Sequence, residues 1–194
     1  MKIIPTPISG LIIIEPSVFR DERGFFLETW NQETWAQVVG PSGTPYAFLQ
    51  DNHSRSARGV LRGLHFQRPP HEQGKLVSVT RGRALDVAVD LRTASPTYGQ
   101  HFSLELNGTS GADNPRRALW IPPGFAHGFL ALEDETDFVY KCTAGYAPGK
   151  EGALPWNDAK LAIDWGLKEE GISVPNVSAK DAAAESFESF ESPF

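Results

Sequence analysis

The segment Ile121–Phe129 (IPPGFAHGF) places a Pro-Pro-Gly turn between two apolar runs and puts His127 just after the turn. Proline and glycine often bend the chain between strands, because proline presets its φ angle and glycine tolerates a positive one. The apolar runs on either side, Leu119–Ile121 and Gly128–Leu132, are short and are expected to be strands. His127 therefore lies at the entrance to a strand.

The same pattern of short apolar runs separated by turns extends over most of the chain. Phe102, Leu104 and Leu106 alternate cleanly with polar residues, as in a strand with one buried face. Further strands are expected at Leu11–Ile14, Phe25–Glu28, Arg62–Gln67, Lys75–Val79, Ala84–Asp90 and Phe138–Cys142. Strands that recur about every 8–12 residues are typical of an all-β sandwich or barrel. No long helix alternates with them, which disfavours a doubly wound α/β sheet.

Helices are expected at two places only. Asn31 is a typical N-cap for a short helix, Gln32–Val39, that Gly40-Pro41 would end. A second short helix is expected near Asp158–Ile163. Residues 185–194 repeat Glu-Ser-Phe and are expected to form a frayed tail, or alternatively to dock their phenylalanines on a neighbour.

Length and composition limit the class of protein. The chain has 194 residues, so we expect a single domain, residues 1–184, followed by the tail. Its net charge of −6 argues against general nucleic-acid or anionic-membrane binding but leaves room for a local basic pocket. A lone cysteine, Cys142, excludes an internal disulfide framework. No stretch fits a signal peptide or a membrane span, so a cytoplasmic protein is expected.

The strand Arg62–Gln67 contains the first residue with candidate chemistry. Alternation puts His65 on one face with Gly63 and Gln67, and glycine there indicates close approach of a ligand or of another backbone. Arg62 is expected to point the other way unless a bulge re-aims it.

A metal site is disfavoured. The segment around His127 is similar to the second metal motif of cupin barrels, so His65 and His127 could share one barrel interior. Such metal sites usually also take a His-x-His pair and a carboxylate, whereas Gly63 stands where the first of those histidines would be. Two histidines alone make a poor metal site, so we expect no metal.

Tyr140 has two interpretations. It shares a strand face with Phe138 and Cys142, which favours a core position. The alternative is a proton donor that faces the same cavity as His65. Elsewhere, Arg23, Arg62 and Lys75 together could hold a diphosphate, although no glycine-rich phosphate loop is present.

Taken together, several segments closely resemble those of the dTDP-4-dehydrorhamnose 3,5-epimerase family. Members of this family are cupin-type sugar-nucleotide epimerases. The resemblance extends from about Ile4 to Ala184. The segments that carry it are Asp21–Phe26, Gln50–Ser54, Val60–Gln67, Gly74–Leu76, Trp120–Pro122, Gly124–Phe129, Trp156–Asp158 and Ser178–Asp181.

This resemblance implies a cupin-like jelly-roll β-barrel that forms a homodimer and needs neither metal nor cofactor. Its substrate would be a 4-keto-6-deoxyhexose joined to dTDP, and its product dTDP-4-dehydro-L-rhamnose, inverted at carbons 3 and 5. The ketone at carbon 4 acidifies the hydrogens on both carbons. A base can therefore remove one of them to give an enolate, and an acid can return a proton on the opposite face.

The resemblance also implies roles for particular residues. His65 matches the base, and Asp181 matches the carboxylate that pairs with it. Tyr140 matches the acid, which overrides the core interpretation. Lys75 matches the cation beside the 4-keto oxygen, where enolate charge develops.

The substrate-binding residues implied by the family are more numerous. Tyr146 matches an aromatic residue that stacks on thymine, although Gly145 before it departs from the usual bulky residue. Asp86 lies in a matched strand and is expected at most to support the site from behind. The remaining matches are Arg23, Glu28, Gln50, Asp51, Asn52, Arg62, Lys75, His127, Glu151 and Lys180.

Three alternatives stay open. A close relative could invert only carbon 3 or only carbon 5, because the rotamer of Tyr140 decides which face it serves. A metal-dependent cupin enzyme and a non-catalytic sugar-nucleotide binder are the other two. The long Gly108–Pro115 loop departs from the family pattern, and this departure bears on base and sugar preference rather than on the type of reaction.

Overall fold

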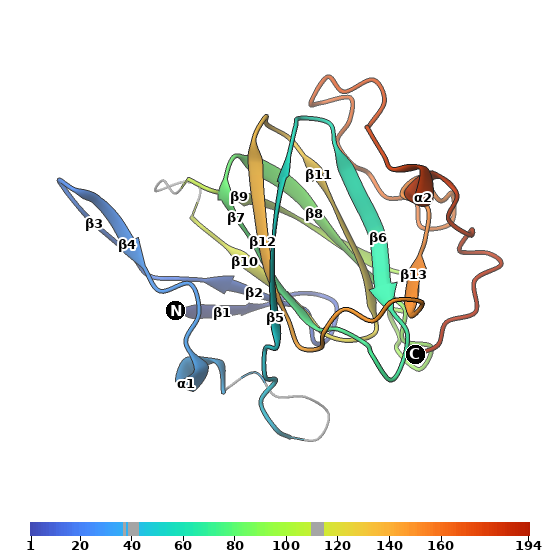
Figure 1. Cartoon of the computed structure of the whole chain (residues 1–194), viewed down its shortest axis with the longest axis horizontal. Coiled ribbons are helices and arrows are strands. Elements are labelled where there is room, and N and C mark those ends of the chain that lie inside the picture. The colour runs from blue at the N-terminus through green and yellow to red at the C-terminus, as the bar shows by residue number, and fades with distance from the viewer. Residues whose placement is uncertain (37, 39–42, 110–114) are drawn as a thin grey trace.

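Within residues 1–36, 38, 43–109 and 115–194, which this computed structural model describes, the strands form two main antiparallel sheets and one hairpin (Figure 1). The first sheet has the order β1 (Lys2–Pro5), β2 (Ile12–Glu15), β10 (Ala118–Ile121), β7 (Lys75–Arg81), β12 (Thr136–Cys142) and β5 (Gln50–Ser56). The second has the order β13 (Glu151–Ala153), β6 (Leu61–Gln67), β11 (Phe125–Ala131), β8 (Arg83–Asp90) and β9 (His101–Asn107). The hairpin pairs β3 (Val18–Asp21) with β4 (Gly24–Leu27). This architecture confirms the predicted all-β, cupin-like jelly roll.

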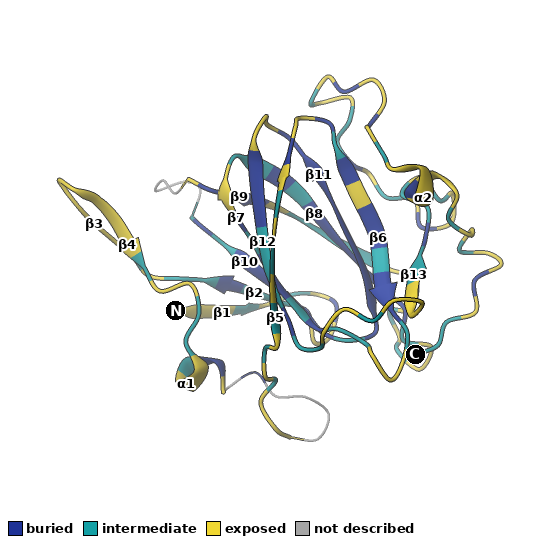
Figure 2. Cartoon of the chain, in the orientation of Figure 1, coloured by how far each residue is buried: buried dark blue, intermediate teal, exposed yellow. Residues whose placement is uncertain are grey.

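The main core lies between the two sheets, because alternate residues of facing strands point inward. Phe129 and Phe138 stack there with ring centroids 4.0 Å apart, and they join buried Val77, Leu119 and Ile121. Every residue of β11 is buried (Figure 2). A second apolar cluster lies on the outer face of the second sheet, where the C-terminal segment covers it. A third, rich in aromatic rings, packs Trp35 and Phe48 against Trp120.

The helices only partly match the sequence prediction. α1 (Gln32–Trp35) begins at the predicted cap, since the Asn31 side chain accepts hydrogen bonds from the backbone N–H groups of Glu33 and Thr34. It ends at Trp35 rather than Val39, and its predicted terminator Gly40-Pro41 lies outside the described residues.

The helix predicted near Asp158–Ile163 is wrong. This stretch forms turns, because the Asp158 carboxylate accepts hydrogen bonds from the backbone N–H groups of Lys160 and Leu161. Ala162 has a φ angle of 47°, which a right-handed helix does not contain. Instead, the second helix is α2 (Ala179–Ala182), which was not predicted.

The prediction of a frayed tail is also wrong. Phe190 is buried and its ring packs edge-on against Phe66, with centroids 5.5 Å apart. Phe187 lies against Tyr98 at 5.4 Å. The apolar rings of the tail thus cover the chain's own second sheet. Most of the long Gly108–Pro115 loop lies outside the described residues.

Both helices in the described part of the chain are four residues long, so neither has the length or apolar character to cross a membrane.

Candidate active site

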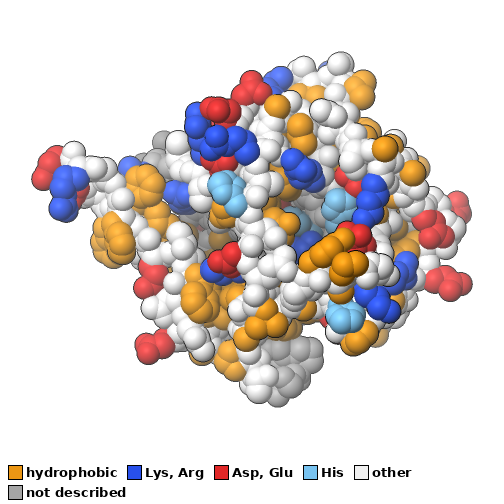
Figure 3. Space-filling view, viewed as in Figure 1, with side chains coloured by type: hydrophobic (Ala, Val, Ile, Leu, Met, Phe, Trp, Pro, Cys, Tyr) orange, Lys and Arg blue, Asp and Glu red, His pale blue; other side chains and the backbone are white. Residues whose placement is uncertain are grey.

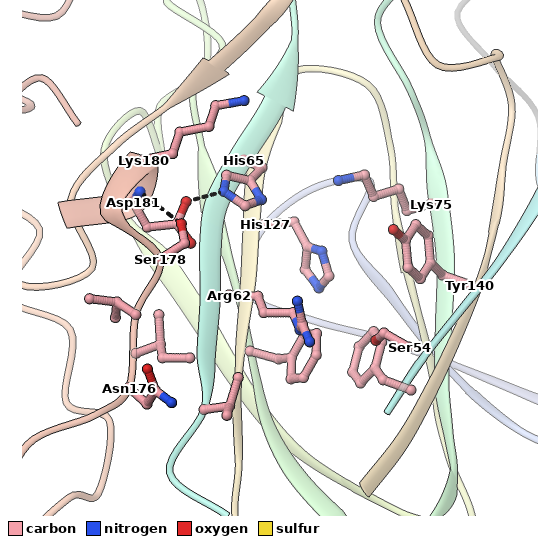
Figure 4. A pocket seen from close by; sticks show the side chains of 15 residues that line it. Ser54, Arg62, His65, Lys75, His127, Tyr140, Asn176, Ser178, Lys180 and Asp181 are labelled. Carbon is pink, nitrogen blue, oxygen red and sulfur yellow. Dashed lines mark hydrogen bonds and ion pairs between the residues drawn. The ribbon is translucent and has the colours of Figure 1, made fainter. Parts of the chain in front are cut away.

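A cavity of about 550 Å³ opens between the two sheets, and its two walls carry different residues. β6 and β11 contribute Arg62, His65 and His127, whereas β7 and β12 contribute Lys75 and Tyr140 (Figure 4). Figure 3 shows basic and histidine side chains gathered on this face of the molecule. The cavity is therefore basic although the chain carries a net charge of −6. The sequence leaves room for such a local basic pocket, which suits an anionic ligand.

His65 is joined to Asp181 by a short contact, 2.5 Å between the histidine Nε2 and the carboxylate Oδ1. Ser178 N-caps α2, and its hydroxyl accepts a hydrogen bond from the Asp181 N–H, which orients that residue toward β6. Burial lowers the pKa of His65, and the bond to Asp181 opposes this shift. His65 is thus a neutral imidazole near pH 7 whose Nε2–H faces the carboxylate, leaving Nδ1 free toward the cavity.

An irregularity in the pairing of β6 with β11 aims two residues into the cavity. His65 pairs with His127, but Arg62 pairs with Phe129, so two residues of β6, Gly63 and Leu64, lie opposite one residue of β11, Gly128. His127 and Phe129 are two apart and share a face, and their partners therefore share it too. The sequence predicts that Arg62 points away from His65 unless a bulge turns it, and this bulge does so.

Lys75 and Tyr140 stand on the opposite wall without partners. In the described part of the chain, neither the ammonium nor the phenol makes a hydrogen bond or ion pair. Burial lowers the pKa of Lys75 and raises that of Tyr140; nearby Cys142 reinforces the second shift, and Arg62 opposes it. Unpartnered polar groups that face a cavity are free to bind a ligand. Tyr140 therefore faces the same cavity as His65, as the second interpretation of this residue predicted. It is not a purely core residue.

His127 forms a second histidine–carboxylate pair deeper in the cavity. Its Nε2 lies 2.7 Å from Oδ2 of Asp86, and both side chains are buried. Asp86 thereby takes the supporting position that the sequence suggested. Its other oxygen, Oδ1, has no hydrogen-bond partner in the described chain.

A neighbouring cavity of about 350 Å³ shares His65, Lys75, Tyr140 and Lys180 with the first. It adds four predicted binding residues that the first cavity lacks, namely Gln50, Asn52, Tyr146 and Glu151. The Gln50 side chain accepts a hydrogen bond from the Tyr146 N–H at 2.8 Å, and Lys180 pairs with Glu151 at 2.8 Å. The pKa of the Glu151 carboxyl is lowered chiefly by its hydrogen bond from Lys180.

Three predicted binding residues do not reach either of these cavities. Asp51 points to the other face of β5, because side chains alternate along a strand, and there it binds Lys141 at 2.9 Å. Arg23 lies at the tip of the β3–β4 hairpin, where it pairs with Asp21. Glu28 follows the same hairpin and accepts a hydrogen bond from Asn31. The hairpin extends away from the barrel on the side opposite α2 (Figure 1).

Sequence reasoning also missed residues that shape the site. Ser54 lines the main cavity from β5, a strand with too few apolar residues to show a hydrophobic alternation. The period-two polar pattern Gln50, Asn52, Ser54 was the available signal. Gln67 holds the loop that carries Tyr146, since its amide donates to the Gly145 carbonyl and accepts from the Ala147 N–H.

The described residues contain no cluster of three or more histidine, cysteine or acidic side chains that could hold a metal ion. The arrangement of the side chains that line the main cavity supports proton transfer. One wall presents a histidine oriented by a carboxylate, the facing wall presents a phenol, and a lysine lies beside the phenol (Figure 4). Such a site can remove a proton next to a carbonyl, stabilise the oxyanion and return a proton from the other side.

Comparison with known proteins agrees with this geometry. The family model described as dTDP-4-dehydrorhamnose 3,5-epimerase matches residues 5–189. The chain belongs to this family. It is 49% identical over 184 residues to the dTDP-4-dehydrorhamnose 3,5-epimerase of Salmonella typhimurium, covering 95% of this chain and 94% of that one.

Solved epimerase structures share the whole fold. A dTDP-6-deoxy-D-glucose-3,5-epimerase from Legionella pneumophila, in complex with dTDP-4-keto-L-rhamnose, superposes with a TM-score of 0.87 at 46% identity, covering 98% of this chain and 94% of that one. A 3′-monoepimerase from Streptomyces bikiniensis, in complex with dTDP-quinovose, gives 0.82 at 32% identity, covering 94% and 86%. The fold is therefore shared by double and single epimerases.

Proposed function

We propose that this epimerase-family enzyme converts dTDP-4-dehydro-6-deoxy-D-glucose to dTDP-4-dehydro-L-rhamnose by inverting carbons 3 and 5. The observation that carries the proposal is the placement of the His65–Asp181 pair and Tyr140 on facing walls of one cavity. Family membership at 49% identity to a curated 3,5-epimerase supports the same reaction.

In the proposed mechanism, Nδ1 of His65 accepts the proton from carbon 3 or carbon 5, and the electron pair moves onto the 4-keto oxygen. Asp181 stabilises the imidazolium that forms, as in a catalytic triad. Lys75 stabilises the enolate oxygen, and its low-dielectric surroundings strengthen that interaction. Tyr140 then protonates the same carbon on the opposite face. One proton is lost and one gained at each carbon, so no redox cofactor is needed. The His65 imidazolium then gives its proton to solvent and the Tyr140 phenolate takes one from solvent, which restores both groups for the second carbon.

The second cavity is proposed to hold the nucleotide. It adjoins the sugar cavity through His65 and Lys75, and Tyr146 at its edge has 57% of its surface exposed, which leaves its ring available for stacking on a base. Lys180 lines both cavities and Arg62 lines the first, so these two cations can bind the diphosphate that joins sugar to base.

A homodimer is also proposed, and the β3–β4 hairpin supports it. A two-stranded hairpin is marginally stable by itself in water, yet this one exposes Phe19, Phe25 and Phe26. Exposed apolar groups of this kind mark association surfaces. Arg23 and Glu28 reach neither cavity of their own chain, so their predicted contact with substrate would have to be made in the cavity of a partner subunit. A cytoplasmic location stays a prediction from the sequence.

The first test is proton NMR of dTDP-4-keto-6-deoxyglucose with the protein in heavy water. We expect the signals of the hydrogens on carbons 3 and 5 both to disappear. Exchange at one carbon alone would favour a mono-epimerase, the second candidate, which the likeness to the Streptomyces bikiniensis enzyme supports. Exchange at neither carbon would overturn the proposed function.

The base is tested with His65→Ala. We expect exchange at both carbons to fall by roughly 10²–10⁴-fold, because a positioned general base contributes about that much, while binding of dTDP survives. His101→Ala on β9, outside both cavities, is the matched control and is expected to keep normal exchange. Normal turnover of His65→Ala would contradict the assigned role.

A further inference from the structure

α2, which carries Asp181, is too short to hold its own position. It has four residues, and isolated helices below roughly 12 residues are marginal in water. Apart from the Lys180–Glu151 ion pair and the Asp181–His65 contact, its position relative to β6 comes from the segments on either side. On the N-terminal side, the backbone of Asn176 bonds to Leu61 at 2.9 Å and to Gly59 at 2.7 Å. These bonds attach the chain to the start of β6.

On the C-terminal side, the attachment is the tail, residues 185–194. The rings of Phe190 and Phe194 pack edge-on against Phe66, with centroids 5.5 and 5.8 Å away. Phe66 directly follows His65 in β6. The tail that continues from α2 thus docks on the residue next to the histidine that Asp181 contacts.

The two ends of the tail are also fixed by polar contacts. The Phe187 N–H donates to the Asp158 carboxylate at 2.8 Å. Further along, the Thr93 N–H and hydroxyl donate to the Phe194 carbonyl at 3.0 and 2.7 Å, and the Ser192 hydroxyl donates to the Leu91 carbonyl. The tail is thereby tied to the loop after β8 and to the turns after β13.

We propose that the tail is a positioning element of the active site, with Phe190 as its main anchor, because its docking holds the Asp181 carboxylate on His65. This inference rests on the proposed function. The His65–Asp181 contact joins residues 116 apart in sequence at 2.5 Å, and catalytic geometry is intolerant of displacement. A shift of about 1 Å can cost roughly 10²-fold in rate.

The test compares Phe190→Ala, and a chain that ends at Ala184, with the full-length enzyme. We expect kcat to fall roughly 10–100-fold, since a loosened carboxylate no longer orients the base, while KM and dTDP affinity change less than about threefold. Phe190→Leu should restore most of kcat because it refills the apolar site. Glu191→Ala, an exposed tail residue, is the matched control and should behave as full-length enzyme.

Two readouts separate positioning from a general loss of structure. In a double-mutant cycle with Asp181→Asn, Phe190→Ala should cause little further loss of kcat, because both changes remove the same contact. In proton NMR, the downfield Nε2 proton expected of a short His65–Asp181 hydrogen bond should be lost in Phe190→Ala, with circular dichroism unchanged.

Additive effects of the two substitutions, or an intact Nε2 proton in Phe190→Ala, would overturn the positioning role. The NMR signature needs no substrate, so it tests the tail even if the full-length enzyme causes no exchange in heavy water. That last result would refute the proposed function alone.

Discussion

At the scale of single residues, the proposed mechanism separates the group that meets substrate, His65, from the group that orients it, Asp181. The His65 side chain is 41% exposed to the cavity, whereas that of Asp181 is 4% exposed. Burial alone would depress the pKa of His65, and the adjacent carboxylate opposes this depression. The pair therefore keeps a base that is neutral near pH 7 but still basic enough to take a proton.

The activity should consequently depend on pH in a defined direction. Neutral His65 is the active form, so kcat/KM is expected to rise with pH and level off above an apparent pKa below about 6.5, the ordinary histidine value. Asp181→Asn removes a group that raises the pKa of His65, so the acid limb should move to lower pH and the plateau should fall roughly 10²–10⁴-fold. Exchange rates measured from pH 4 to 9 check both the position of the acid limb and the height of the plateau. A limb that moves to higher pH would contradict this account.

Tyr140 should govern how a proton is returned to the reacting carbon, and not how the carbon is deprotonated. Burial raises the pKa of its phenol, which keeps it protonated and able to donate at neutral pH. Tyr140→Phe is therefore expected to keep part of the exchange in heavy water but to lose inverted product. NMR of the sugar product measures both. Tyr98→Phe, outside both cavities, is the control, and full product from Tyr140→Phe at the normal rate would exclude the acid role.

At the scale of elements, the close pairing of β6 and β11 determines which side chains face the cavity. Gly63 has a φ angle of +127°, and an added Cβ would lie 2.5 Å from the Cα of Gly128. Only glycine at both positions allows the two backbones to approach at the bulge. That approach aims Arg62 and His65 into one cavity, which a regular strand would not do.

Gly63→Ala should therefore destabilise the protein by more than backbone strain alone. A non-glycine residue at such a φ costs roughly 1–3 kcal/mol, and the clash with Gly128 adds to it. Gly24→Ala is the matched control, because Gly24 has a φ angle of +128° with nothing within 4 Å of its Cβ position. Urea denaturation should give a lower midpoint for Gly63→Ala than for Gly24→Ala. Equal midpoints would argue against the close approach.

At the scale of the whole molecule, an acidic chain encloses a basic cavity and extends an apolar hairpin away from it. Phe19 and Phe26 are cross-strand partners on this hairpin and are 64% and 68% exposed. Their rings bury little surface within the described chain. A partner subunit is the proposed cover.

The dimer is tested by replacing this pair with polar residues. The double variant Phe19→Ser/Phe26→Ser should weaken dimerisation by at least roughly tenfold, since buried aromatic residues dominate interfaces. Sedimentation measures the change. Val174→Ser, at another exposed apolar site, should leave association unchanged. A monomeric wild-type protein, or a double variant that dimerises as tightly, would contradict the proposal.

The strands, the family and most of the residues that line the two cavities could be predicted from the sequence. These depend on local signals, namely period-two alternation, turn residues and short motifs such as those around His65 and His127. The same signals wrongly predicted a helix at residues 158–163, where hydrogen bonds to the Asp158 side chain favour turns. They also could not detect β5, because its residues are mostly polar.

How the site is assembled could not be predicted from the sequence, because it depends on packing between distant segments. Pairing between distant strands created the bulge that aims Arg62 inward, and alternation along β5 turned Asp51 away. Packing of the tail on Phe66 depends on an apolar surface that forms only when the second sheet is complete. These outcomes rest on contacts between residues far apart in sequence, which no local pattern encodes.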